Sequence, residues 1–127
     1  GCNASIATDC TRAGAYYSDK SSRSKNTDKQ AREISVKFLD KACELKDGNG
    51  CLILAATYEA IFGDNKKAKF YIEKSCDLDY GSGCEMLGLR YENGTYGFEV
   101  DKKKAKYFYK KACKLGAKWS CKYEQAL

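Results

Sequence analysis

Eight cysteines are the residues of this chain whose type and spacing could do chemistry. They form four pairs, each separated by eight positions: Cys2/Cys10, Cys43/Cys51, Cys76/Cys84 and Cys113/Cys121. Even pairs at a fixed spacing indicate disulfides and an oxidising compartment. Structural zinc sites instead use a short Cys-x2-4-Cys knuckle, which this chain lacks. There is also no Cys-x-x-Cys motif to lower the pKa of a thiol, so we expect structural disulfides, no metal site and no cofactor.

Cys2 has an alternative fate. Because it follows Gly1 at the start of the chain, it could be the acylated cysteine left by a lipoprotein cleavage site. The constant spacing to Cys10 favours a disulfide, and lipid anchoring through Cys2 stays open. The chain begins GCNASIATDC without an initiator Met, which suggests either a mature form whose signal peptide has been removed or a trimmed chain. These features predict a periplasmic or secreted protein.

The constant spacing also predicts an internal repeat whose unit holds two helices. From Cys10, the second cysteines of the pairs follow one another after 41, 33 and 37 residues. The first helix of each unit is expected to begin at that cysteine, because the residues at positions +3, +4 and +7 share one helical face. They are Leu54, Ala55 and Tyr58 in one unit, and Leu87, Gly88 and Tyr91 in the next.

The second helix of each unit is expected to end at the first cysteine of the next pair. Asp64 and Asp101 can cap its start, and apolar pairs stand five and four positions before the cysteine: Phe38/Leu39, Tyr71/Ile72 and Phe108/Tyr109. The glycines between paired cysteines are expected to supply the positive φ of a helix C-terminus. Such a turn brings two helix ends within the roughly 5.5 Å that a disulfide needs, so we predict bonds within each pair.

These patterns predict an all-α fold, a solenoid of disulfide-stapled helix pairs. With 127 residues, of which 43% are apolar, the chain can form one packed domain. We expect a single domain over residues 1–127, with repeats at about 10–50, 51–83 and 84–120 and a terminal cap at 121–127. The extra residues of the longer units, 18–26 and 93–100, are predicted to form surface loops, where insertions cost little.

The net charge of +6 comes from lysines spread through the repeats. A nucleic-acid-binding surface combines a basic stripe with exposed aromatic residues, whereas the aromatics here recur at expected core positions. No apolar run approaches the roughly 18 residues that a membrane span needs. We therefore expect no nucleic-acid partner and no membrane span, and the sequence leaves the oligomeric state open.

Two motifs carry a resemblance to known proteins. The pattern C-x2-L-[GA]-x2-Y begins at Cys51 and Cys84, and K-A-K-x-[YF]-[IY]-x-K-[SA]-C begins at Lys67 and Lys104. Together they resemble the Sel-like, tetratricopeptide-related repeats, and the cysteine pairs resemble the Helicobacter cysteine-rich proteins. The resemblance implies a right-handed α/α superhelix whose concave groove binds a protein or peptide partner, in host or cell-envelope interaction.

A surface for this partner is predicted on the first helix of each unit, opposite its core stripe. Positions +2, +5 and +6 mix apolar, adaptable and arginine side chains, which suits peptide capture. The candidate partner-binding residues are Arg12, Tyr16, Ile53, Thr57, Met86 and Arg90. Because Met86 and Arg90 lie outside the core stripe, we expect their joint replacement by Ala to weaken partner binding with little loss of fold. The alternative is that this face is only the inner wall of the superhelix.

An enzymatic role is the second hypothesis, because the resemblance also implies a weak β-lactamase or penicillin-binding activity. Serine enzymes of that kind use S-x-x-K with S-D-N and K-T-G. The one S-x-x-K, at residues 22–25, lies in a predicted polar loop, and neither companion motif is present. Without histidine, a Ser-His-Asp triad and a histidine zinc site are excluded. We therefore predict no catalytic residues.

Overall fold

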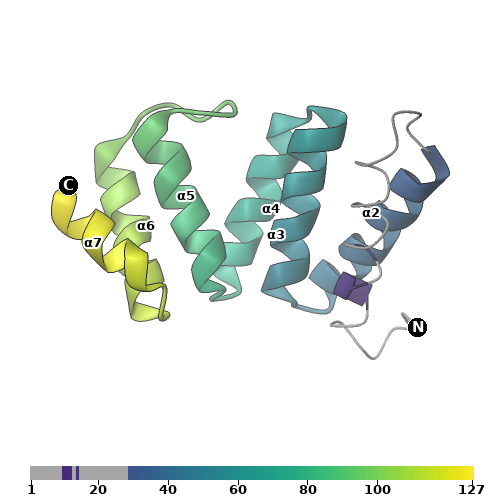
Figure 1. Ribbon diagram of the computed structural model, residues 1–127, viewed down its shortest axis with the longest axis horizontal. Helices are drawn as coiled ribbons and strands as arrows, with labels where there is room; N and C mark the ends of the chain where they lie inside the picture. The colour runs from purple at the N-terminus through teal and green to yellow at the C-terminus, as the bar shows by residue number, and fades with distance from the viewer. Residues whose placement is uncertain (1–9, 13, 15–28) are drawn as a thin grey trace.

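The computed structural model describes residues 10–12, 14 and 29–127, which form a row of helices (Figure 1). Residues 10–12 and 14 are helical; after them come α2 (Lys29–Glu44), α3 (Gly48–Thr57), the π-helix η1 (Tyr58–Phe62), α4 (Asn65–Asp77), α5 (Gly81–Asn93), α6 (Lys102–Lys114) and α7 (Lys118–Ala126). Consecutive helices pack against each other from α2 at one end of the row to α7 at the other. No strand occurs in these described ranges, and the predicted all-α solenoid is confirmed.

α4 and α6 each begin after an aspartate cap. The Asp64 carboxylate accepts a hydrogen bond from the Lys67 amide at 3.1 Å at the start of α4. Asp101 caps α6 in the same way, accepting from the Lys104 amide at 3.0 Å. Each carboxylate satisfies an amide that has no partner inside its helix, so both predicted helix starts are confirmed.

The first helix of each unit begins earlier than expected. α3, α5 and α7 each start three residues before the second cysteine of their pair. In the first two turns the positive φ falls on Lys46 and Asp79, at 65° and 60°, and only in the third turn on a glycine, Gly116. Gly50 of α3 and Gly83 of α5 lie where the neighbouring helix leaves no room for a side chain. A Cβ on Gly83, for example, would lie 2.3 Å from the Ser75 Oγ.

Disulfides join the end of one helix to the start of the next across each repeat boundary. They link Cys43 of α2 to Cys51 of α3, Cys76 of α4 to Cys84 of α5, and Cys113 of α6 to Cys121 of α7, with Cα–Cα distances of 4.7, 4.5 and 4.9 Å. Cys10 is buried and disulfide-bonded. Cys2 lies outside the described residues, so its bond to Cys10 stays a prediction.

The core between the two helices of a unit is matched in size. Gly88 of α5 faces Tyr109 of α6, and a Cβ on this glycine would lie 2.5 Å from the tyrosine ring. In the preceding unit the corresponding residues are Ala55 and Ile72, which are buried in the same cluster. The smaller Gly88 thus faces the larger Tyr109, and the larger Ala55 is paired with the smaller Ile72.

The insertion between α5 and α6 contributes to the core, so the prediction of a surface loop at residues 93–100 is only partly right. Phe98 is 4% exposed, and its ring meets the Tyr91 ring edge-on with 5.1 Å between centroids. The neighbouring Tyr96, Gly97, Glu99 and Val100 are exposed. The other long loop, residues 18–26, lies outside the described residues.

Replacing Gly88 with Ala tests the size matching. The added methyl group overlaps the Tyr109 ring, so we expect the free energy of unfolding to fall by about 1–3 kcal/mol. Urea denaturation followed by circular dichroism measures the change. The double variant Gly88→Ala/Tyr109→Ile reproduces the residues of the preceding unit and should lose less than the sum of the single variants. Strict additivity would contradict the contact.

Candidate partner-binding site

The predicted partner-binding residues lie in unequal surroundings. Arg12 is exposed, Ile53 and Met86 are half-buried, and Tyr16 lies outside the described residues. Thr57 is only 2% exposed, and its hydroxyl donates a hydrogen bond to the Ile53 carbonyl at 2.9 Å. A buried side chain offers a partner little surface, so Arg12, Ile53 and Met86 are the members of this row best suited to contact.

Arg90 is tied into the fold. Its guanidinium donates to the Glu59 carboxylate at 2.9 Å from Nη2 and 3.3 Å from Nε, and lies 4.3 Å from the centre of the Tyr96 ring. The Arg90 and Glu59 side chains are 16% and 9% exposed. This bidentate pair links α5 to η1. Arg90 therefore supports the fold, against the expectation that its loss would leave the fold intact.

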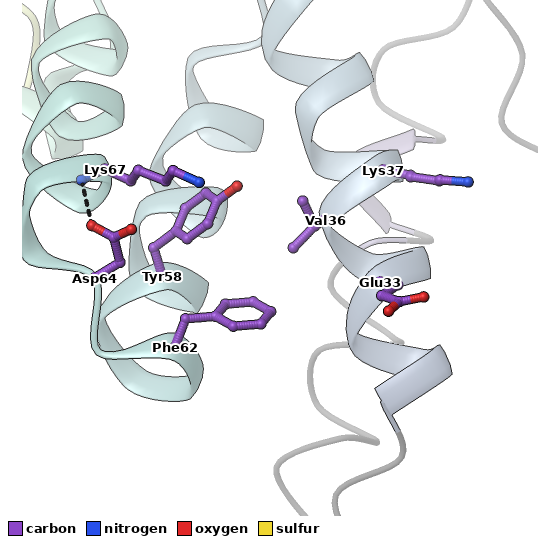
Figure 2. A pocket seen from close by; sticks show the side chains of 7 residues that line it. All are labelled: Glu33, Val36, Lys37, Tyr58, Phe62, Asp64 and Lys67. Atoms are coloured by element: carbon purple, nitrogen blue, oxygen red, sulfur yellow. Dashed lines mark hydrogen bonds between the residues drawn. The ribbon is translucent and has the colours of Figure 1, made fainter.

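A cleft of about 470 Å³ separates α2 from η1 and the start of α4 (Figure 2). It is lined by Glu33, Val36, Lys37, Tyr58, Phe62, Asp64 and Lys67. Figure 2 shows Val36 pointing from α2 toward the Tyr58 and Phe62 rings on the opposite wall. Apolar groups facing each other, with charged groups around them, suit a large apolar side chain of a ligand. No sequence pattern points to this cleft.

The aromatic wall of the cleft depends on the π-helix. η1 continues α3 and ends at Gly63, which has a φ of 63° and whose amide donates to the Tyr58 carbonyl. Phe62 packs on Tyr58 with 5.6 Å between ring centroids, yet remains 45% exposed. Because η1 ends the helix, Phe62 stands at the open edge of this wall, and its exposed ring makes the wall a candidate contact surface.

The next repeat junction shows how the equivalent place is covered. Tyr91 corresponds to Tyr58, and Phe98 packs on it as Phe62 packs on Tyr58. There, however, Lys69 of α4 reaches over the Phe98 ring at 5.0 Å, and Phe98 is buried. At the cleft the corresponding residue of α2 is Val36, seven positions before its cysteine as Lys69 is before its own. The shorter side chain leaves Phe62 uncovered.

The described residues contain no group of three or more His, Cys, Asp or Glu side chains that could hold a metal ion. Burial, followed by the hydrogen bond to Glu92, raises the pKa of Tyr109, and burial followed by the Asp40 charge raises the pKa of Tyr71. A raised pKa keeps a tyrosine hydroxyl protonated, which does not activate it as a nucleophile. The S-x-x-K motif at residues 22–25 lies outside the described residues.

Comparison with known proteins confirms the resemblance drawn from the motifs. A family model for the Sel1 repeat matches residues 10–47, 58–80 and 81–116. Among solved structures, cysteine rich protein B of Helicobacter pylori is 28% identical, with a TM-score of 0.67, and the match covers 94% of this chain and 97% of that chain. A Sel1 repeat protein from Oxalobacter formigenes has a TM-score of 0.68 at 19% identity, over 88% of this chain and 83% of that chain, and supports the fold alone. No curated protein matches the chain significantly.

In the part of the chain that the structure describes, no helix is both long enough and apolar enough to cross a bilayer.

The ion pair between Arg90 and Glu59 should contribute to stability. Because both side chains are mostly buried, we expect a double-mutant cycle with Arg90→Ala and Glu59→Ala to give a coupling free energy of about 1–3 kcal/mol. Exposed pairs typically give about 0–1 kcal/mol. Urea denaturation of the four proteins measures it. A coupling free energy near zero would mean that the pair of Arg90 and Glu59 does not stabilise the fold.

Proposed function

We propose that this chain, which belongs to the Sel1 repeat family, is an extracytoplasmic scaffold that binds a protein or peptide partner. Sel1 repeats are protein-interaction modules, and a row of stacked helix pairs offers a partner an extended surface. The three disulfides support an oxidising compartment such as the periplasm or the extracellular space, in a cell-envelope or host interaction.

The observation that carries the proposal is the uncovered aromatic wall at the cleft. Phe62 is 45% exposed beside Tyr58, and Val36 stands across from both. When a partner covers a large apolar side chain that is half exposed to solvent, the burial stabilises the complex. The equivalent phenylalanine, Phe98, is covered from within the chain. We infer that a large apolar side chain of the partner covers Phe62, in the place where Lys69 lies over Phe98 in the next unit.

The predicted row on the first helices supplies the wider surface in this proposal. Arg12, Ile53 and Met86 are its contact residues, because Thr57 is buried and Arg90 is held by Glu59. A partner that spans several repeats gains affinity from each, so a single change in the row should have a small effect on affinity. Phe62 is the proposed anchor, and a change there should have a larger effect.

Selection of random peptides on the disulfide-bonded protein supplies the probe for a test. We expect the enriched peptides to share a large apolar residue, and Phe62→Ala to weaken binding of a labelled peptide at least about tenfold in fluorescence anisotropy. Val36→Lys copies the next junction and should also weaken binding, although it leaves the aromatic wall in place. Met86→Ala tests the row separately.

Phe70→Ala is the matched control, because Phe70 is 58% exposed on α4 and does not line the cleft. It should bind the peptide as the unmodified protein does. If Phe62→Ala and Val36→Lys bound equally well while Met86→Ala did not, the anchor would lie in the row and the cleft assignment would be wrong. If no peptide were enriched, the peptide-scaffold proposal itself would fail.

A further inference from the structure

The outward faces of α4 and α6 carry the same shallow hollow at the same four positions. On α4 a hollow of about 380 Å³ is lined by Phe70, Glu73, Lys74 and Asp77. On α6 one of about 290 Å³ is lined by Tyr107, Lys110, Lys111 and Lys114. Counted from the cysteine of each helix, both sets occupy positions −6, −3, −2 and +1. The two faces can therefore be compared residue by residue.

Each hollow is bounded by a large aromatic side chain that is mostly in solvent. Phe70 is 58% exposed and Tyr107 is 63% exposed, so these equivalent positions leave two aromatic rings uncovered. Other apolar residues of the same helices, such as Ile72 and Ala105, are buried. Exposed aromatic residues are enriched at protein interfaces.

The charges around the two rings have opposite signs. Positions −3 and +1 hold Glu73 and Asp77 on α4 but Lys110 and Lys114 on α6, and all four side chains are exposed. Position −2 is a half-buried lysine on both helices; on α6 it is Lys111, which donates to the Cys76 carbonyl at 3.1 Å and lies 3.6 Å from Asp79. Farther along, α4 carries Lys66 and Lys69, and α6 carries Lys103 and Lys106. The contrast between the faces is thus made by positions −3 and +1.

We propose that the chain forms a two-fold symmetric dimer through these faces, with α4 of each copy against α6 of the other. α4 and α6 occupy the same place in successive helix pairs and run in the same direction (Figure 1). A two-fold axis parallel to both helices places α4 of one copy against α6 of the other. Equivalent positions of the two helices then lie at the same level along the axis. Phe70 then meets Tyr107 of the second copy, Glu73 meets Lys110, and Asp77 meets Lys114. The contact occurs twice and closes on itself, so assembly stops at the dimer.

A second copy brings opposite charges together at positions −3 and +1, although the lysines that both helices share at −2, −7 and −10 then face each other. A soluble polyanion meets an opposite charge at positions −3 and +1 on α6 alone. A polyanion would engage Lys110 and Lys114, but it would leave Phe70 uncovered and be repelled by Glu73 and Asp77. The net charge of +6 on each chain opposes association at long range. Complementary charges in contact act at distances below the Debye length of about 10 Å at 0.1 M salt, so the dimer should weaken as salt is raised.

Sedimentation equilibrium of the disulfide-bonded protein tests this arrangement. We expect a monomer–dimer equilibrium at low ionic strength that shifts to monomer at high ionic strength. The acidic-face variant Glu73→Lys/Asp77→Lys and the basic-face variant Lys110→Glu/Lys114→Glu should each raise the dissociation constant of the homodimer at least about tenfold, because like charges then face each other. Circular dichroism checks that these exposed substitutions leave the fold intact.

Mixing the two variants distinguishes this pairing from other causes. One variant has two acidic faces and the other two basic faces, so together they should form a heterodimer although each alone is monomeric. A protein that stays monomeric at millimolar concentration and low salt, or variants that do not pair when mixed, would overturn the proposal. Binding to dextran sulfate tests the remaining alternative. If only the basic-face variant lost this binding, and neither variant changed the dissociation constant of the homodimer, the lysines would serve an anionic ligand and the proposal would also be overturned.

Discussion

The disulfide at each repeat boundary is the constraint on which the rest of the structure depends. In a solenoid each unit contacts only its neighbours, so stability depends on the junctions between units. The bonds from α2 to α3, α4 to α5 and α6 to α7 hold the last turn of one helix against the first turn of the next. Closing a loop of this length restricts the unfolded chain and contributes about 2.5 kcal/mol. Typical domains have net stabilities of about 5–15 kcal/mol, so each junction matters.

Fixed junctions allow the opposite ends of the helices to differ between units. At those ends the link between the helices of a unit is short after η1 and longer after α5. The longer link carries Phe98 into the core, whereas the short one leaves Phe62 on a π-helical turn beside open space. The aspartate cap and the lysine over the tyrosine ring are the same in both units. The cleft therefore exists because the link after η1 is short and because Val36 has a short side chain. The other features form a frame that is the same in both units.

Much of this frame follows from the sequence, because its signals are local. The cysteine spacing, the caps at Asp64 and Asp101 and the periodic apolar positions each concern residues within about two helical turns of one another. The missed features depend on distant partners. Arg90 and Glu59 are 31 positions apart, and their pairing follows only once α5 lies beside η1. Phe98 sits in a polar stretch, and its burial is decided by Tyr91 and Lys69. The positive φ was wrongly assigned to the glycines of the first two turns. A glycine in the sequence indicates freedom of φ, but the close approach of Ser75 to Gly83 appears only in the folded structure.

Repeats also serve as internal controls for which residues the fold requires. The buried position four residues before the cysteine keeps an apolar side chain in every unit, as Leu39, Ile72 and Tyr109 show. The exposed position after the cysteine carries Glu44, Asp77 and Lys114 in successive units. Glu44 and Asp77 are the last residues of α2 and α4, where the helix dipole disfavours a negative charge by about 0.3–1 kcal/mol, whereas Lys114 at the end of α6 is favoured. Helix stability therefore does not explain the acidic residues on the first two units. The change of sign along the row is better understood as a property of the surface, where a contact with another molecule can offset that local cost.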